Sequence, residues 1–249
     1  MLGLPNAGGV TGDHLDPAIR PSMKLMELSL DGSGLTASGL RELLRRCGAN
    51  LITLNLGGSK AIKEADLVRL TDDATFPNLR DLELSGCGLT DAGFNQVLCM
   101  FPRLKFLSLG AEQVSGAGLS EGVSLTSLTT LILQCGITDA GLINLLKVFP
   151  NLEFVDLHGA KVSGDGLANF HGRCARLKVL KLAFCDLLTN DGLNELLRIF
   201  PSLNYLTLNS TQGRKFVGCS HCQELGKPAY WLLIGYTRVN NQSEAGSAS

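Results

Sequence analysis

Two cysteines in the C-terminal part of the chain have the spacing of a metal-binding pair. Cys219 and Cys222 form a Cys-x-x-Cys unit with His221 between them. A structural zinc site needs four ligands, which commonly come from two such pairs. No cysteine or histidine follows Cys222, and the nearest earlier cysteine, Cys185, belongs to the repeated pattern described below. We therefore predict a solvent-facing loop here rather than a zinc site.

Two other stretches hold residues that could act on a substrate. The sequence GGSK at 57–60 is similar to part of a phosphate-binding loop, but the G-x-x-x-x-G-K-[ST] spacing is missing. His158 and Asp156 are two residues apart, yet no nucleophile accompanies them. Neither G-x-S-x-G nor H-E-x-x-H occurs. The sequence therefore predicts a protein that is not an enzyme and that uses no cofactor or metal.

A repeated phrase organises most of the chain and fixes the positions of these residues. The pattern L-x-x-L-x-L occurs eight times, at steps of 24 to 28 residues. One copy departs from it, because Val155 replaces the middle leucine. A fixed period of this length is typical of a repeat architecture, in which each unit stacks on its neighbours. The copies begin at Leu25, Leu51, Leu79, Leu104, Leu128, Leu152, Leu177 and Leu203.

Each copy has the pattern of a strand followed by a helix. Leu82 and Leu84 are two residues apart, so their side chains leave a strand on the same face. A Thr or Ser then precedes Gly-Leu, and its hydroxyl can accept a hydrogen bond from the free N–H groups of a helix start. Phe-Pro closes several units, because proline cannot continue a helix. The hydroxyl residues expected at helix starts are Thr36, Thr90, Ser115, Thr138, Ser163 and Thr189.

Small polar residues recur directly after the strands. We expect their thiols and hydroxyls to form a buried ladder that satisfies backbone carbonyls at the bend. Because they recur at the repeat period, structure explains these cysteines better than metal binding or nucleophilic chemistry does. The column contains Ser33, Ser59, Cys87, Glu112, Cys135, Ala160, Cys185 and Thr211.

This set of motifs resembles one subfamily of repeats. The repeats are similar to the cysteine-containing leucine-rich repeats. In both, a cysteine follows the strand, the pattern (I/L)TDxGL comes next, and LL and (F/C)P.L close the unit. That subfamily is best known from F-box/LRR proteins, the substrate receptors of SCF ubiquitin ligases. The resemblance extends over about residues 23–210, and the matching positions are Cys87, Cys135 and Cys185 with 90–93, 138–141 and 189–192.

The repeat predicts an α/β leucine-rich-repeat solenoid, a horseshoe of about eight repeats. Its parallel sheet is expected on the concave side and its helices on the convex side. The predicted divisions are an N-terminal polar segment (1–22), the repeats (23–210), a C-terminal cap or edge segment (211–239) and a disordered tail (240–249).

Composition limits the partners and the compartment. The chain has 249 residues, eight cysteines and a net charge of −1, so no basic excess argues for nucleic acid. No segment approaches the ~18 consecutive apolar residues of a membrane span, and the N-terminus lacks the pattern of a signal peptide. We therefore expect no membrane partner, reduced cysteines and a cytoplasmic or nuclear location.

The resemblance implies a non-catalytic module that binds a protein through its concave face, and it favours substrate recognition for an SCF ubiquitin ligase. An F-box is a helical Skp1-binding module ahead of the repeats, but the residues before Leu25 are few and rich in turn formers. SCF components are therefore expected as partners only if an F-box lies upstream. The alternative is an intracellular scaffold or sensor domain, such as a fragment of a larger receptor, unrelated to ubiquitin.

The third and fifth positions of each copy should point away from the core, onto the concave face. Phe106, Phe154 and Tyr205 occupy the third position in alternate copies, so adjacent members should stand roughly 10 Å apart. Ile132 is expected between the first two and Val179 between the last two, which would give an apolar binding stripe. The candidate protein-binding residues are Glu27, Asp81, Glu83, Phe106, Ile132, Phe154, Asp156, Val179, Lys181 and Tyr205.

Overall fold

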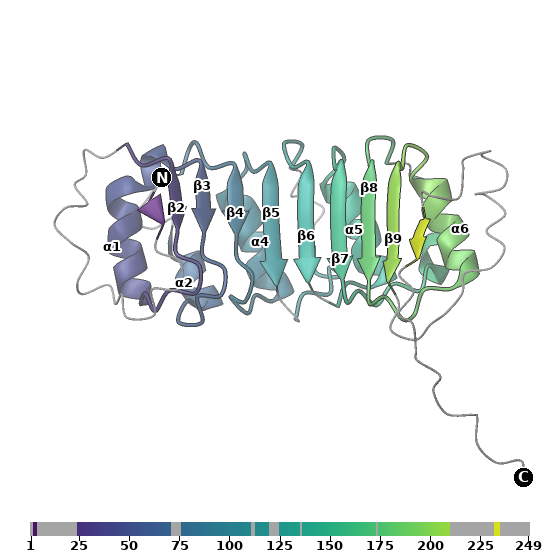
Figure 1. Ribbon diagram of the computed structural model, residues 1–249, viewed down its shortest axis with the longest axis horizontal. Helices are drawn as coiled ribbons and strands as arrows, with labels where there is room; N and C mark the ends of the chain where they lie inside the picture. The colour runs from purple at the N-terminus through teal and green to yellow at the C-terminus, as the bar shows by residue number, and fades with distance from the viewer. Residues whose placement is uncertain are drawn as a thin grey trace, which may run out of the picture.

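The leucine pattern produces one continuous parallel sheet, with its strands in sequence order (Figure 1). The computed structural model describes residues 2–3, 24–70, 76–110, 113–119, 125–134, 136–172, 174–209 and 232–234. The strands are β1 (Leu2–Gly3), β2 (Glu27–Ser29), β3 (Thr53–Asn55), β4 (Asp81–Glu83), β5 (Phe106–Gly110), β6 (Thr130–Gln134), β7 (Phe154–His158), β8 (Val179–Ala183), β9 (Tyr205–Asn209) and β10 (Leu232–Ile234).

The helices cover one face of this sheet and leave the other face open. In Figure 1, α2, α4 and α5 lie behind the strands. The eight strands β2–β9 come from the eight leucine copies, so the predicted leucine-rich-repeat solenoid is confirmed. The helices are α1 (Ala37–Cys47), α2 (Glu64–Val68), α4 (Asp91–Met100), α5 (Asp139–Val148) and α6 (Asn190–Ile199), with short 3-10 helices η2 (Gly48–Asn50) and η3 (Asp165–Leu167).

The core is a stack of leucine ladders between the sheet and the helices. Leu131 and Leu133 of β6 are completely buried, and the leucines of neighbouring strands lie in register beside them. Phe149, which precedes proline, is also fully buried and fills the layer at the end of α5. Each repeat therefore buries its apolar side chains mainly against adjacent repeats, as in other solenoids.

Four of the predicted helix starts are confirmed. Thr36, Thr90, Thr138 and Thr189 are N-cap residues, and each hydroxyl oxygen accepts a hydrogen bond from the N–H of the glycine three residues later, at 2.9–3.3 Å. This satisfies one of the N–H groups that a helix start leaves without an internal partner.

The prediction of α-helices after Ser115 and Ser163 is wrong for the described residues. Among residues 113–119 there is no helix, and only η3 follows Ser163. The next residues, Gly116 and Gly164, have φ of 77° and 90°. This left-handed conformation is not that of the first residue of an α-helix.

Two glycines at helix starts are required by close packing between repeats. A Cβ atom on Gly141 would collide with the carbonyl oxygen of Ser115, and one on Gly192 would collide with that of Ser163. Each collision would involve backbone, which cannot swing away as a flexible side chain can. The helices that follow Thr138 and Thr189 therefore sit directly against the turn of the preceding repeat.

The predicted buried ladder after the strands is present at Ser59, Cys87 and Cys185, but not at Ser33, whose buried hydroxyl has no hydrogen-bond partner among the described residues. Ser59 Oγ donates to the Leu30 carbonyl at 3.0 Å, and Cys87 Sγ donates to the Leu56 carbonyl at 3.7 Å. Cys185 Sγ donates to the Leu157 carbonyl at 3.4 Å. Glu112, Cys135 and Thr211 lie outside the described residues.

Burial keeps the ladder thiols protonated. It raises the pKa of the Cys87 thiol to about 11 and that of the Cys185 thiol to about 12. A thiolate is the reactive form of cysteine, so these two groups are weak nucleophiles at neutral pH. The five cysteines that the structure describes are free thiols, and Cys99 is the exposed one among them.

Both ends of the sheet carry a strand outside the leucine pattern. β1 pairs with β2, and β10, which comes from the apolar WLLIGY segment, pairs in parallel with β9. The predicted segments 1–22, 211–239 and 240–249 lie otherwise outside the described residues. In the part of the chain that the structure describes, no helix has both the length and the apolar character needed to cross a bilayer.

Candidate protein-binding face

The open face of the sheet displays the third and fifth residues of the leucine copies, with the exception of Ser108, which is 4% exposed. Leu28, Leu54 and Leu82 on the opposite face are at most 1% exposed, whereas Thr53 and Asp81 beside them are partly exposed. The strand phase is therefore the predicted one, and most of the candidate binding residues are accessible from the open face. The register across the third position is Glu27, Thr53, Asp81, Phe106, Thr130, Phe154, Val179 and Tyr205.

Three apolar side chains stand next to one another at the C-terminal end of this face. Phe154 pairs with Val179, and Val179 pairs with Tyr205, so the three residues cross β7, β8 and β9 without interruption. Phe154 and Val179 are partly exposed, and Tyr205 is 37% exposed. We call these three residues the apolar stripe.

The stripe is shorter than the sequence predicts. Thr130, not Ile132, lies between Phe106 and Phe154 in the register. Ile132 pairs instead with Ser108 and Asp156, two residues further along the strands. The expectation overlooked that only residues at the same position of the pattern are direct neighbours across parallel strands. Phe106 and Ile132 therefore stand apart from the stripe.

A charged pair borders the apolar stripe. Lys181 Nζ lies 3.7 Å from Asp156 Oδ2 and 5.1 Å from the centre of the Phe154 ring. A lysine over the face of an aromatic ring is attracted by the ring quadrupole, and such contacts contribute ~0.5–1 kcal/mol at exposed sites. Lys181 therefore holds the ring and the carboxylate in one arrangement on the open face.

The N-terminal half of the open face is acidic instead of apolar. Asp81 accepts a hydrogen bond from the Thr53 hydroxyl at 3.2 Å, and Glu83 accepts one from the Ser85 N–H at 2.8 Å. Glu27 is exposed on the neighbouring strand β2. The structure therefore divides the candidate residues into an acidic region on β2–β4 and an apolar region on β7–β9.

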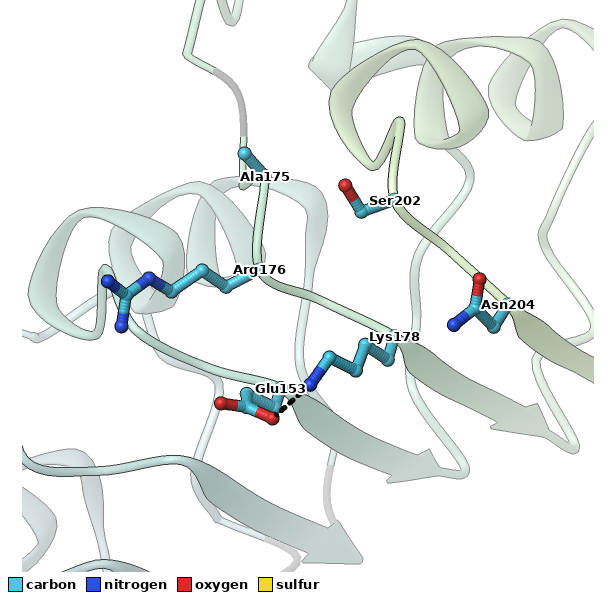
Figure 2. A pocket seen from close by; sticks show the side chains of 6 residues that line it. All are labelled: Glu153, Ala175, Arg176, Lys178, Ser202 and Asn204. Carbon is cyan, nitrogen blue, oxygen red and sulfur yellow. Dashed lines mark hydrogen bonds and ion pairs between the residues drawn. The ribbon is translucent and has the colours of Figure 1, made fainter.

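Two shallow depressions lie where the strands begin. The larger, about 510 Å³, is lined by side chains at the starts of β7, β8 and β9, as Figure 2 shows. The smaller, about 310 Å³, lies at the starts of β2, β3 and β4. The lining residues are Glu153, Ala175, Arg176, Lys178, Ser202 and Asn204 in the larger depression, and Lys24, Met26, Asn50, Ile52, Asn78 and Arg80 in the smaller.

The larger depression contains one short ion pair. Lys178 Nζ lies 2.7 Å from Glu153 Oε2, drawn as a dashed line in Figure 2. The hydrogen bond from Lys178 lowers the pKa of the Glu153 carboxyl below its ordinary value. Arg176 extends away from this pair in Figure 2. The depression therefore offers cationic and neutral polar groups with a single carboxylate that is already paired.

Sequence reasoning missed an exposed aromatic at the opposite ends of the strands. Phe184 is 45% exposed, and its ring contacts the His158 ring with 4.7 Å between centroids and a tilt of 57° between the ring planes. Its backbone has φ of 58°, the left-handed region that bulky residues rarely adopt. Glycine occupies the equivalent position in other copies, at Gly32, Gly58, Gly86 and Gly159, so this replacement of glycine was the available signal.

The candidate chemical groups do not assemble into a reactive site in the described residues. His158 contacts the Phe184 ring at a tilt of 57°, while Asp156 pairs with Lys181. Ser59 of the GGSK stretch is buried in the ladder. No group of three metal-ligating side chains occurs within the described ranges, and Cys219, His221 and Cys222 lie outside them.

Comparison with known proteins agrees with this architecture. A family model described as "Leucine Rich repeat" matches residues 77–93. Over 126 residues the chain is 36% identical to NACHT, LRR and PYD domains-containing protein 5 of Homo sapiens, a match that covers 46% of this chain and 10% of that protein. The chain therefore spans only a small part of the length of this relative.

Two solved structures share the fold. A chain of the Rad7 and Elc1 complex in yeast aligns with a TM-score of 0.56 and 22% identity, covering 74% of this chain and 56% of that one. The TLR13–ssRNA13 complex aligns with a TM-score of 0.53 and 19% identity, covering 75% of this chain and 29% of that one. At these identities the likeness concerns the fold. The chain has the architecture of a leucine-rich-repeat solenoid.

Proposed function

We propose that this chain is a non-catalytic protein-interaction module that binds its partner through the open, concave face of the sheet. One observation carries the proposal: the apolar stripe crosses three adjacent strands on the face that the helices leave uncovered. Accessible aromatic side chains on rigid strands are typical interface anchors, because they bury a large area at a small cost in conformational entropy. The stripe is the proposed centre of the interface.

The charged side chains around the apolar stripe determine which partner surface can fit the open face and in which orientation it binds. Asp156 and Lys181 border it on β7 and β8, while Glu27, Asp81 and Glu83 make the N-terminal half of the face acidic. Opposite charges across an interface raise the association rate and fix the register, and like charges exclude wrong partners. A partner that is apolar where it meets β7–β9, and not acidic where it meets β2–β4, fits this face.

Two biological contexts are supported by different observations. The cysteine-containing repeat motifs resemble F-box/LRR proteins, and this resemblance supports substrate recognition for a ubiquitin ligase. The identity to the human NACHT, LRR and PYD protein supports the alternative, a scaffold or sensor repeat domain within a larger receptor. We favour the first context, with the repeats at 23–210 acting in the cytoplasm or nucleus.

The test is capture of partners by the tagged chain and by matched variants. The double variant Phe154→Ala/Tyr205→Ala removes the stripe rings, and Ser29→Ala/Asn55→Ala changes the same open face near its other end. We expect specific proteins to be lost only with the first variant. With one purified partner, its affinity should fall roughly 5- to 150-fold, which corresponds to ~1–3 kcal/mol.

The result can go against the proposal in a clear way. If the stripe variant has the parent's circular dichroism and melting temperature yet keeps every partner, the stripe is not the interface. Skp1 among the captured proteins would favour the SCF context. Because Skp1 is expected only where an F-box lies upstream of the repeats, a transcript that encodes or lacks that F-box decides the case in which Skp1 is not captured.

A further inference from the structure

The strand starts form a strongly cationic edge in a chain of net charge −1. We define the strand-start edge as the residues directly before and directly after the first leucine of each copy. Six of these are cations and one, Glu153, is a carboxylate, so the edge carries a formal charge of +5. The cations are Lys24, Arg80, Arg103, Lys105, Arg176 and Lys178.

Most of this charge is not neutralised by the described part of the chain. Lys178 is the one edge cation with an ion pair there, to Glu153. Arg80 Nη1 donates to the Arg103 carbonyl at 3.3 Å, and Arg103 Nη1 donates to the Pro77 carbonyl at 3.2 Å. A carbonyl fixes the direction of a guanidinium without cancelling its charge. The edge is therefore arranged in advance for an anionic partner.

Stabilisation of helix C-termini does not account for these cations. Basic side chains near the last turn of a helix interact favourably with its dipole. In this chain the last-turn cations are other residues, namely Arg45, Arg46, Lys147 and Arg198. The edge cations stand instead next to the strand starts. Lys24 and Arg80 line the smaller depression, and Arg176 and Lys178 line the larger.

We infer that the strand-start edge docks an acidic segment of the protein that the open face binds, an inference that rests on the proposed function. Arg176 and Lys178, with the neutral polar groups of Ser202 and Asn204, line the larger depression. Such groups match carboxylates, because charged donors make stronger hydrogen bonds to ionised oxygens than neutral donors do. The fitting ligand is a segment of Asp or Glu residues.

The segment must also contain apolar residues. Lys178 directly precedes Val179, and Asn204 directly precedes Tyr205, so the larger depression borders the apolar stripe. Lys105 likewise directly precedes Phe106. A chain with carboxylates next to aromatic or aliphatic side chains can place the first on the edge and the second on the open face.

A protein segment suits this surface better than a nucleic acid does. Glu27, Asp81 and Glu83 lie on the open face beside the N-terminal part of the edge and repel a phosphodiester backbone. The six cations are spread over seven strands, from β2 to β8, roughly 29 Å at ~4.8 Å per strand. Double-stranded DNA presents one charge per ~1.7 Å, far more than this edge neutralises. An acidic peptide can instead place its carboxylates only where cations are found.

The experiment measures fluorescence anisotropy of a labelled peptide of Glu-Glu-Phe repeats with the full chain. The variant Lys105→Gln/Arg176→Gln removes two exposed edge cations that stand outside the short Lys178–Glu153 ion pair. The control Lys60→Gln/Lys161→Gln removes two exposed cations away from the edge, with the same change in net charge. We expect the edge variant to bind roughly five- to tenfold more weakly, and the control to change by less than about twofold.

Each further outcome has a defined meaning. Absence of binding, or equal weakening in both variants, overturns the inference. Tighter binding of labelled oligothymidylate than of the peptide, lost in the edge variant, also overturns it and assigns the edge to nucleic acid. Retention of a captured partner by the edge variant, but not by Phe154→Ala/Tyr205→Ala, contradicts the inference while the proposed function stands. If the edge variant loses the captured partner and Phe154→Ala/Tyr205→Ala retains it, the apolar stripe is not the interface, and the strand-start edge remains the binding surface.

Discussion

The β6 and β7 repeats are adjacent and start from similar phrases, yet they fold differently after the strand. In the β6 repeat, Thr138 caps α5 by accepting a hydrogen bond from the Gly141 N–H. In the β7 repeat, the Ser163 hydroxyl donates to Asp139 Oδ2 at 2.8 Å, and only η3 follows. The hydroxyl at this position thus caps a helix in the β6 repeat, whereas in the β7 repeat it accepts from the Asp165 N–H of its own turn and donates to the preceding repeat.

The residue after the hydroxyl decides between these outcomes. Asp139 follows Thr138 and lies in the first turn of α5, where a carboxylate is favourable. Gly164 follows Ser163 with φ of 90°, which turns the chain away from helical geometry. The same contrast holds between Thr90-Asp91 and Ser115-Gly116, because Ser115 Oγ donates to Asp91 Oδ2 at 2.7 Å. A helical repeat therefore supplies the carboxylate that organises the turn of the next repeat.

The largest effect is expected in the core that both kinds of repeat share. Leu131→Asp places a charge at a fully buried position of β6, where it lacks a partner. We expect the free energy of unfolding to fall by about 4 kcal/mol or more, measured by urea denaturation. Thr130→Asp is the matched control, because Thr130 is partly exposed on the open face of the same strand. Equal loss in both variants would mean that the strand phase is wrong.

The core could be predicted because it depends on period alone. The eight leucine copies and the threonine caps are local patterns, and each has one physical meaning. The turns after Ser115 and Ser163 were predicted wrongly because the capping rule was applied without the following glycine. Gly116 and Gly164 were visible in the sequence, but their carboxylate partners, Asp91 and Asp139, lie in other repeats.

The candidate binding face could be predicted only in part. Alternation along a strand gives the residues that face away from the core, and this placed Phe154, Val179 and Tyr205 together. Neighbours across strands depend on register, which separates Ile132 from the stripe. The cationic edge escaped notice because its members are far apart in the sequence and become neighbours only when the repeats stack. A motif search looks at neighbouring positions in the sequence, so it does not add up charges that come from different repeats.

A smaller effect is expected from the link between the two kinds of repeat. Asp139 accepts hydrogen bonds from the N–H groups of Ser163, Gly164 and Gly166, each at 3.0 Å. Asp139→Ala should lower the free energy of unfolding by about 1–2 kcal/mol, because these donors lose their partner at once. The control Asp165→Ala removes an exposed acceptor of the Thr189 hydroxyl, and we expect about 0.5 kcal/mol or less.

That comparison has a direct readout. Urea denaturation of both variants gives the two free energies, and hydrogen exchange should show faster exchange at 163–166 in Asp139→Ala only. If the two variants were equally stable, Ser163 and its neighbours would be satisfied without Asp139. The hydrogen bonds that Asp139 accepts from the next repeat would then contribute nothing measurable to the free energy of unfolding.

The smallest effect concerns the residue that follows the strand end in neighbouring repeats. Gly159, after β7, has φ of 72°, and Phe184, after β8, has φ of 58°. A left-handed conformation costs a residue with a Cβ roughly 1–2 kcal/mol and costs glycine almost nothing. Phe184→Ala keeps this strain and loses the contact with His158, whereas Phe184→Gly loses the same contact and the strain together.

The glycine variant should therefore be more stable than the alanine variant by up to about 1 kcal/mol, after the larger chain entropy of unfolded glycine is subtracted. At an ordinary exposed position with negative φ the order would be reversed, so the sign of the difference is the test. Urea denaturation of both variants under the same conditions gives that sign. An alanine variant at least as stable as the glycine variant would show that Phe184 has no backbone strain in solution. Gly159 and Phe184 would then differ in their side chains but not in the energetic cost of their backbone conformation.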